Sequence, residues 1–240
     1  MDWPLRSTMF RPEDYFDLVH TEHATLFEKV ENVWEALSRI GTYLQLNLQS
    51  GIEGKPIGKP LIGKRARIGR GTLIENGAMI KGPAWIGEHC QIRHGCYIRE
   101  NVIVGNGVIL GNSCELKNCL VFDGVQLPHF NYVGDSILGY KAHLGAGVIL
   151  SNVKLTPGEI WVVGPNGKVA TGLRKFGAIL GDYVKVGCNS LLNPGSLVGR
   201  HAVLYPGCQW HGVLPAHSIV KLRQLPLEIL SGKTSLQQTE

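Results

Sequence analysis

Long apolar runs, a signal sequence and clusters of basic residues are all missing from this 240-residue chain. Its apolar runs fall well short of the roughly eighteen residues needed to cross a bilayer. The first residues, MDWPLRSTMFRPEDYFDL, lack the basic-then-apolar order of a signal peptide. We therefore expect a cytoplasmic protein with no membrane partner.

Basic residues are scattered singly along the chain. Lys and Arg number 24 against 19 Asp and Glu, a net charge of +5 without any basic run. This distribution argues against a nucleic acid partner and favours a small anionic ligand, with phosphate groups the natural candidates. The six cysteines include no CxxC pair, and the chain is not a small secreted disulfide scaffold.

Repetition is what the sequence has in abundance. A period of six fits neither an α-helix nor one long strand, but it does fit a short strand followed by a turn, repeated. It predicts a mainly β fold, a parallel β-helix in which three hexads, about eighteen residues, make one triangular coil. The aliphatic or aromatic positions are Ile62, Ile68, Ile74, Ile80, Ile86, Ile92, Ile98, Val104, Leu110, Leu116 and Phe122, then Leu138, Leu144, Leu180, Val186, Leu192, Val198, Leu204 and Trp210.

The fifth position of each hexad is usually small and is expected to point into the coil. Cys90, Cys96, Cys114 and Cys208 all fall in that position. We interpret them as small buried hydrophobic residues, not as metal ligands or disulfide partners.

An amphipathic helix is predicted before the repeat. Apolar residues recur at helical spacing between Thr21 and Asn47, Thr25 and Glu28 form a candidate capping box, and Pro12 marks a shorter helix before them. We expect the apolar stripe of the long helix to pack on the open end of the prism or on another subunit.

The remaining boundaries follow from composition. A Gly- and Pro-rich connector, LQSGIEGKPIGKP, divides a helical segment and linker at 1–60 from a β-helix at 61–223, and residues 224–240 form a C-terminal tail. Two β-rich runs around GPNG predict a hairpin inserted at about 153–174. Insertions of this kind commonly border a binding site.

Three cationic residues occupy hexad positions that the pattern usually gives to Gly. Lys81, Arg99 and Lys117 are spaced by one coil, so we expect them to stack on one corner of the prism, roughly 4.8 Å apart. Stacked like charges repel unless they spread into solvent or share an anion. The column is therefore either a solvated ladder or a phosphate clamp in which Arg99 supplies bidentate geometry.

Most of the nine histidines are interpreted as exposed structural residues, because His20, His23, His201, His211 and His217 lie at turns or near the helix. His89 and His94 are spaced like the zinc ligands of γ-class carbonic anhydrases, which are also hexapeptide prisms. No histidine lies between His23 and His89 to supply the third ligand that catalytic zinc needs, so we expect no metal.

His129 lies in LPHFNYVGDS, where the six-residue step breaks, and we expect this segment to bulge from the prism. Phe130 and Tyr132 flank it, and Asn131 and Asp135 follow. Histidine is the side chain best suited to remove a proton from an amine or hydroxyl nucleophile near neutral pH. His129 is therefore a candidate general base.

The stretches PHFNYVGDSILGYKAHLGAGVILSN and RKFGAILGDYVKVG resemble the hexapeptide-repeat acyltransferases. The resemblance is to the acetyltransferase domain of the bifunctional UDP-N-acetylglucosamine pyrophosphorylase/glucosamine-1-phosphate N-acetyltransferase, and more closely to archaeal sugar-1-phosphate nucleotidylyltransferase/acetyltransferases. It covers roughly Pro60 to Arg223. It implies a left-handed β-helix, a homotrimer with active sites between subunits, and a place in UDP-N-acetylglucosamine and cell-envelope biosynthesis.

The resemblance also implies site residues. It places the catalytic base on His129, the oxyanion-binding backbone amide on Ala146, and sugar-phosphate contacts on Arg99, Lys117, Tyr132, Asn152 and Lys175. Acetyl-CoA would lie along the later coils, near Ala146, Cys188 and Pro206, with Lys221 or Arg223 at its phosphates, and acyl transfer would need no metal. His143 replaces an asparagine that contacts the sugar in the bacterial enzymes, and Cys188 replaces a serine.

The implied function is acetyl-CoA-dependent N-acetylation of an amino sugar 1-phosphate such as glucosamine 1-phosphate. A Gly-rich nucleotidyltransferase loop is missing, and residues 1–60 are too few to hold that domain, so we do not expect the chain to make a UDP-sugar by itself. Two alternatives stay open. One is acyl transfer to a nucleotide-linked amino sugar, and the other is a non-catalytic trimeric scaffold that pairs with a separate nucleotidyltransferase through its N-terminal helix.

Overall fold

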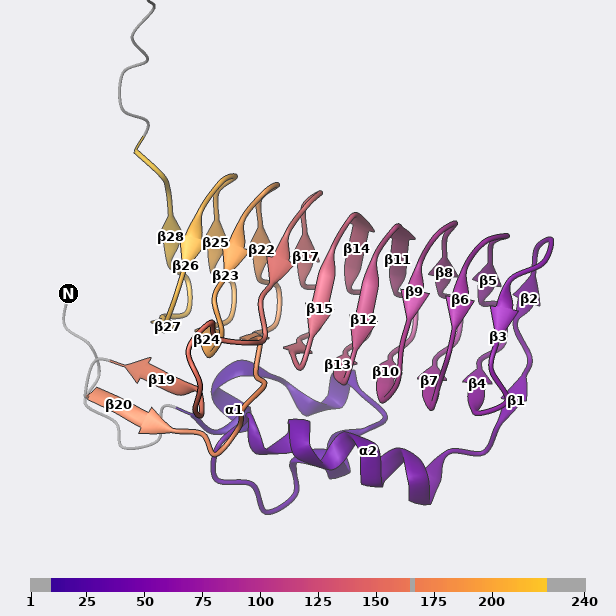
Figure 1. Ribbon diagram of the computed structural model, residues 1–240, viewed down its shortest axis with the longest axis horizontal. Helices are drawn as coiled ribbons and strands as arrows, with labels where there is room; N and C mark the ends of the chain where they lie inside the picture. Colours follow the sequence, from indigo (N-terminus) through magenta and orange to yellow (C-terminus); the bar gives the residue numbers. More distant parts are fainter. Residues whose placement is uncertain (1–9, 165–166, 224–240) are drawn as a thin grey trace, which may run out of the picture.

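The computed structural model describes residues 10–164 and 167–223, which form a parallel β-helix with a helical layer along one side (Figure 1). Three sheets run along the prism axis. Sheet A contains β1 (Gly51–Ile52), β4 (Ala66–Ile68), β7 (Ala84–Ile86), β10 (Val102–Val104), β13 (Cys119–Val121), β16 (Ile137–Leu138), β21 (Ala178–Leu180), β24 (Ser196–Val198) and β27 (Val213–Leu214).

The other two sheets are built the same way. Sheet B contains β2 (Lys55–Pro56), β5 (Leu73–Ile74), β8 (Gln91–Ile92), β11 (Ile109–Asn112), β14 (Gln126–His129), β17 (His143–Leu144), β22 (Lys185–Val186), β25 (Val203–Leu204) and β28 (Ile219–Val220). Sheet C contains β3 (Leu61–Ile62), β6 (Met79–Ile80), β9 (Tyr97–Ile98), β12 (Glu115–Lys117), β15 (Tyr132–Gly134), β18 (Ile149–Leu150), β23 (Leu191–Leu192) and β26 (Gln209–Trp210). The chain runs A, B, C in each of about nine turns, which confirms the predicted β-helix.

Aliphatic side chains stack inside the prism along each sheet. Cys90, Cys96, Cys114 and Cys208 are buried among them as free thiols, as the hexad positions predicted. Burial raises the pKa of the Cys90 thiol to about 11, so this sulfur stays protonated near neutral pH.

The turn length changes part-way along the prism. Ile86 pairs with Val104 one turn on, but Val104 pairs with Val121 and Val121 with Leu138, a step one residue shorter. The apolar residues of the hexad repeat, Phe122 included, are expected to stack inside the prism, and for Phe122 this expectation is wrong. Val121 points inward, and Phe122 packs outside sheet A.

The shortened steps lie at the corner where sheet C turns into sheet A. Asn118 and Asp135 make these turns with φ of 45° and 46°, a left-handed conformation that Asn and Asp tolerate. At His129 the six-residue step from Leu127 to Val133 is intact, and His129 pairs with Asn112 at the end of β14. The expectation that His129 lies on a bulge at a broken step is therefore wrong.

The N-terminal segment is less helical than its apolar spacing predicted. It contains α1 (Pro12–Tyr15), the 3-10 turns η1 (Leu18–His20) and η2 (Ala24–Phe27), and one long helix, α2 (Glu35–Asn47). Thr25 and Glu28 do not begin that helix. Instead, the Glu35 carboxylate accepts hydrogen bonds from the backbone N–H groups of Glu31 and Asn32, at 3.2 and 3.1 Å.

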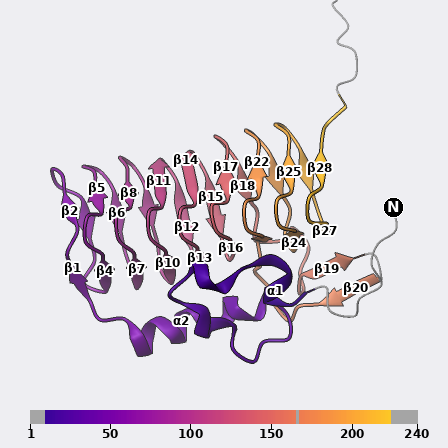
Figure 2. The same cartoon turned by 180° about the vertical axis from the view of Figure 1, so that it is seen from behind.

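The helical layer packs on the side of its own prism. Ile40 and Leu44 of α2 are buried in one cluster with the outward residues Ile103 and Leu120 of sheet A. Figures 1 and 2 show the layer lying along the prism and not across its end. The expected packing on the open end or on another subunit is therefore wrong, because sheet A is apolar on both faces and binds the helix itself.

The predicted hairpin is present. β19 (Trp161–Gly164) pairs antiparallel with β20 (Gly167–Ala170), and the insertion closes where Phe176 N donates to Asn152 O at 3.0 Å. The first coil begins at Gly51, earlier than the predicted boundary at residue 61, because β1 and β2 pair with β4 and β5. The predicted tail at 224–240 lies outside the described residues. Among the described helices, none combines the length and apolarity needed to cross a membrane.

Candidate functional site

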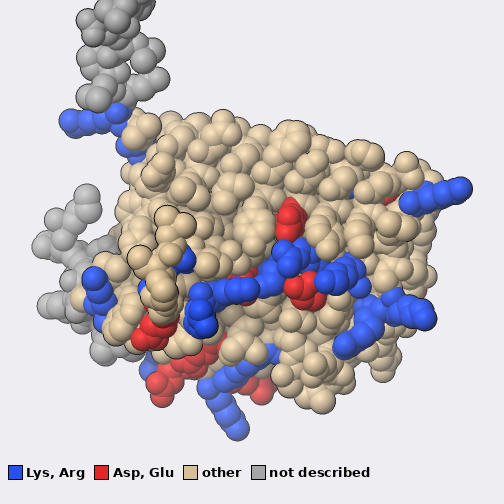
Figure 3. All heavy atoms as spheres, in the orientation of Figure 1, with Lys and Arg blue, Asp and Glu red and all other residues tan. Residues whose placement is uncertain are grey.

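The three predicted cations do form a column at the outer edge of sheet C. The preceding residues pair in register, Ile80 with Ile98 and Ile98 with Leu116. Lys81, Arg99 and Lys117 therefore occupy equivalent positions in successive turns. Figure 3 shows the resulting band of basic side chains across this face, with acidic atoms beside it.

Carboxylates interleave with this column. Glu100 lies 3.4 Å from both Lys81 and Arg99, and Arg99 Nη1 donates to Glu115 Oε1 at 2.9 Å. The hydrogen bond to Glu115 raises the pKa of Arg99. Local neutralisation thus explains how the like charges can stack, and it leaves unused donors on the guanidinium and ammonium groups.

Tyr132, Asp135 and Asn152 form a polar cluster next to Lys117. Asn152 Nδ2 donates to Asp135 Oδ2 at 2.5 Å, and Tyr132 Oη donates to Asn152 Oδ1 at 3.4 Å. Lys117 Nζ lies 3.6 Å from Asp135 Oδ2. Partial burial raises the pKa of the Tyr132 hydroxyl, and the Glu115 and Asp135 charges add to this effect, so Tyr132 stays a donor.

Gly134 makes room for this cluster. It follows Lys117 in the same column. A Cβ at Gly134 would lie 2.6 Å from Tyr132 Oη and 2.7 Å from Asn152 Nδ2, so any larger residue would displace both groups. The column of cations therefore ends where the Tyr132 and Asn152 side chains fold over the sheet.

A second column runs along the corner between sheets B and C, called the B–C corner below. Backbone hydrogen bonds link its successive turns: Gly147 N donates to His129 O at 3.1 Å, Asn189 N to Ala146 O at 2.8 Å, and Gly207 N to Cys188 O at 2.9 Å. These bonds stack four candidate residues in order along the prism: His129, Ala146, Cys188 and Pro206.

The geometry at the head of this column leaves reactive groups accessible. The His129 side chain is exposed, beside the exposed Phe130. Asn131 is buried beneath them, and its side chain donates to Gly145 O at 2.8 Å, which holds the corner in place. Within residues 10–164 and 167–223, the Ala146 N–H donates to no protein acceptor, so this amide is free to bind an anionic oxygen.

Four further candidates lie around these two columns. His143 is on the outer face of sheet B, with Nδ1 3.2 Å from Gln126 Oε1, and partial burial and Lys185 lower its pKa. Lys175 is exposed where the insertion returns beside Asn152. Lys221 Nζ lies 4.5 Å from the centroid of the Tyr205 ring, and Tyr205 directly precedes Pro206. Arg223 is exposed at the end of the described residues.

His89 and His94 show no metal-site geometry. His94 Nδ1 lies 2.7 Å from Asn76 O, and His89 Nε2 lies 3.8 Å from Glu88. In the part of the chain that the structure describes, no group of three or more His, Cys, Asp or Glu side chains is placed to hold a metal ion.

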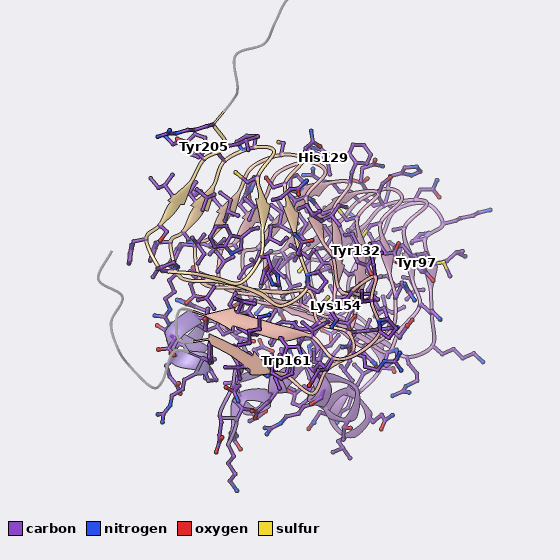
Figure 4. All side chains as sticks on the ribbon, turned by 60° about the vertical axis from the view of Figure 1, so that its left-hand side comes forward. Tyr97, His129, Tyr132, Lys154, Trp161 and Tyr205 are labelled. Atoms are coloured by element: carbon purple, nitrogen blue, oxygen red, sulfur yellow. The ribbon has the colours of Figure 1, made fainter. Side chains whose placement is uncertain are left out.

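The candidate residues therefore fall into two groups on either side of sheet C. In Figure 4, His129 lies at the edge toward the B–C corner, whereas Tyr132 and Lys154 lie toward the hairpin. The sequence predicted the members of both groups. It placed Asp135 only as a residue that follows His129, with no role of its own. Sequence reasoning also missed a cavity between the hairpin and sheet C, which is lined in part by Lys154 and Trp161.

Residues 80–204, more than half of the chain, match the sequence profile of the family described as "GMPPB C-terminal domain". The chain belongs to this family. The matched residues extend from the end of the second turn nearly to the end of the prism and contain His129 and Ala146, whereas Pro206, Lys221 and Arg223 lie outside the match.

Two curated relatives carry the family resemblance further. The bifunctional sugar-1-phosphate nucleotidylyltransferase/acetyltransferase of Sulfurisphaera tokodaii is 34% identical over 93 residues, which are 39% of this chain and 23% of that protein. The bifunctional protein GlmU of Methanococcus maripaludis is 34% identical over 94 residues, with the same coverage. These matches confirm the resemblance, over a shorter stretch than Pro60 to Arg223. The chain spans about a quarter of the length of these relatives.

Among solved structures, the Francisella novicida UDP-N-acetylglucosamine acyltransferase is similar in fold. It is 15% identical with a TM-score of 0.31, over 68% of this chain and 61% of that one. This likeness is too distant to bear on function.

Proposed function

We propose that the protein transfers an acetyl group from acetyl-CoA to the amino group of an amino sugar 1-phosphate such as glucosamine 1-phosphate. One observation carries the proposal. The exposed His129 and the Ala146 N–H begin one column of the prism, on one side of sheet C. The cluster of Lys117, Tyr132 and Asn152 lies on the other side of the same sheet. The name of the Sulfurisphaera tokodaii relative, a bifunctional sugar-1-phosphate nucleotidylyltransferase/acetyltransferase, supports it.

His129 acts as the general base. It takes a proton from the substrate amine, whose nitrogen attacks the thioester carbonyl carbon, and a new C–N bond forms as the C–S bond breaks. The Ala146 N–H stabilises the oxygen that becomes negative during the attack. His129 then returns its proton to the departing thiolate, so the reaction yields the N-acetyl sugar phosphate and free CoA.

Arg99 and Lys117 hold the acceptor phosphate, and Lys175, beside Asn152, supplies a further cation. Arg99 keeps donors beyond those used by Glu115 and Glu100, and a phosphate accepts such donors in pairs. Tyr132 and Asn152 contact the sugar hydroxyls. Acetyl-CoA lies along Ala146, Cys188 and Pro206, with Lys221 and Arg223 near its phosphates, and His143 borders the acceptor.

A homotrimer completes this proposal, because the two groups of residues lie on different edges of one chain. In such an assembly, the His129 corner of one subunit faces the Tyr132 side of sheet C of its neighbour. The scaffold alternative is disfavoured by α2, whose buried face contacts sheet A and is not available to a separate nucleotidyltransferase.

The decisive experiment compares His129→Ala with His94→Ala. The two histidines lie on the same corner of the prism, since Asn112 pairs with His129 and its side chain donates to His94 O at 2.8 Å. Turnover of glucosamine 1-phosphate with acetyl-CoA should fall by about 10²–10⁴-fold in His129→Ala and stay near wild type in His94→Ala. Turnover that survives in His129→Ala would rule out this mechanism.

A further inference from the structure

The cavity missed by sequence reasoning lies between the inserted hairpin and the last turns of sheet C. Its volume is about 810 Å³, which is within the range of roughly 300–1,000 Å³ typical of small-molecule sites. Its lining includes apolar, hydroxyl, amide and basic side chains, chiefly Lys154, Trp161, Val163, Lys168, Asn193 and His211.

The floor of this cavity continues the column of the proposed phosphate binders. Ser151, Asn193 and His211 follow Gly134 in register, because Val133 pairs with Leu150, Leu150 with Leu192 and Leu192 with Trp210. Lys117 precedes Gly134 in the same column. The cavity therefore opens directly beyond the Tyr132–Asn152 cluster, on the side away from Arg99.

The wall of the cavity is strand β19. Val162 is buried against the helical layer, and its neighbours Trp161 and Val163 face the opposite way and line the cavity, to which Ile160 also contributes. The prism holds this strand closely: a Cβ at Gly212 would lie 2.7 Å from Val163 O, and one at Gly195 3.1 Å from Trp161 O. Trp161 is nonetheless 43% exposed, a large aromatic surface on a fixed support.

The charge of the cavity differs from that of the cation column. Its described lining contains Lys154, Lys168 and His211 and no carboxylate. Lys154 Nζ donates to Glu159 O at 2.5 Å, which holds its ammonium group in place. An anionic ligand is therefore attracted here without displacing an acidic side chain.

We propose that this cavity binds the nucleoside portion of a nucleotide-linked amino sugar, with the base stacked on Trp161. This inference rests on the proposed function, since it keeps the acceptor sugar at Tyr132 and Asn152. Because the cavity lies beyond these residues on the side away from Arg99, the phosphates of a nucleotide-linked sugar would point toward Lys154 and Lys168, and the nucleoside joined through them would reach Trp161. Aromatic stacking suits any base, and Lys154 and Lys168 attract the additional phosphate charge.

Calorimetry with the full chain tests the proposal, using UDP, GDP and dTDP as probes. At least one should bind, and its affinity should fall about tenfold or more in Trp161→Ala while Trp161→Phe keeps most of it. Tyr183→Ala is the matched control, because Tyr183 is a comparably exposed aromatic residue, 38% exposed, that does not line the cavity. Absence of binding by all three probes, or binding unchanged in Trp161→Ala, would overturn the proposal.

Turnover separates this inference from the proposed function. Acetylation of glucosamine 1-phosphate should be unchanged within about twofold in Trp161→Ala, whereas the kcat/KM for a nucleotide-linked amino sugar should fall with the binding affinity. Turnover of the sugar phosphate with no nucleotide binding leaves the proposed function intact and sinks the cavity assignment. Nucleotide binding that depends on Trp161, with no acetylation of any amine, would support the cavity assignment and contradict the proposed function.

Discussion

Asp135 is the residue around which the acceptor side of the proposed site is arranged. It is 5% exposed, and its carboxylate accepts from Asn118 Nδ2 at 2.9 Å and Asn152 Nδ2 at 2.5 Å, with Lys117 at 3.6 Å. A buried carboxylate with these partners fixes the direction of each donor. We infer that Asp135 is a positioning residue, which sets the amide of Asn152 and the ammonium of Lys117 without touching substrate.

Asp135→Asn should therefore weaken acceptor binding more than it slows chemistry. The new amide group places a donor against the donors of Asn118 or Asn152, and leaves Lys117 without its counter-charge. We expect the KM for glucosamine 1-phosphate to rise by about tenfold with a smaller change in kcat, and stability to fall by roughly 1–3 kcal/mol. The control is Asp123→Asn, which alters a carboxylate that accepts from Asn106 N at 2.7 Å, away from the cluster. An unchanged KM in Asp135→Asn would contradict the role.

At the scale of elements, the N-terminal segment is held to the prism by a histidine that the fold keeps neutral. His23 is 2% exposed, its Nδ1 lies 2.9 Å from Tyr43 Oη, and its ring packs edge-on against Trp85. Burial lowers the pKa of His23 to about 4, opposed by the nearby Glu22 and assisted by Arg67. The sequence interpretation of His23 as an exposed structural histidine is therefore wrong.

This burial makes stability depend on pH. The unfolded chain protonates His23 near pH 6.5, whereas the folded chain does so only near pH 4, so stability is complete above pH 6.5 and falls as the pH drops toward 4. Between pH 7 and 5 we expect a loss on the order of 2 kcal/mol from this group in urea unfolding. His23→Gln, which cannot titrate, should lose correspondingly less over that interval. Equal pH dependence in the two proteins would show that His23 is not responsible.

At the scale of the whole molecule, the helical layer covers one of the three sheets and leaves two open. Leu61, Met79 and Ile149 project from sheet C and are 66%, 40% and 38% exposed, and Ile219 of sheet B is 63% exposed. Self-association through sheets B and C would bury these residues and bring the two groups of site residues together across an interface. The covered sheet A cannot take part.

We therefore expect a particle of three times the 26.3 kDa chain mass in light scattering coupled to gel filtration. Ile149→Glu should reduce this mass and lower acetyl transfer in parallel, because a charge at the centre of an apolar contact is costly to desolvate. Val19→Glu, at a residue that is 80% exposed on the helical layer, should change neither. A monomeric wild-type protein with full activity would refute the arrangement between subunits.

Sequence periodicity was sufficient for the prism and for the column of Lys81, Arg99 and Lys117, because each turn repeats one simple rule of inward and outward residues. The residues of the second column came from the family resemblance instead. Periodicity failed where that rule is ambiguous. Val121 and Phe122 are both apolar, and since sheet A is covered on its outer face, the pattern cannot distinguish inside from outside there. The shortened turns, and with them the burial of Asp135, were hidden for that reason. The cavity depends on where the hairpin lies, and no spacing within residues 153–174 encodes that position.

The hairpin leaves the prism after Asn152 and rejoins it at Phe176, and the backbone bond between these two residues closes the gap in the coil. Sheet pairing resumes on the far side, with Ile137 beside Ile179 and Leu144 beside Val186. The insertion therefore interrupts the coil without interrupting the pairing of the sheets. If the cavity beside it binds part of the acceptor, as proposed, the 153–174 segment can change in length or composition while the column headed by His129, on a separate corner, keeps its alignment.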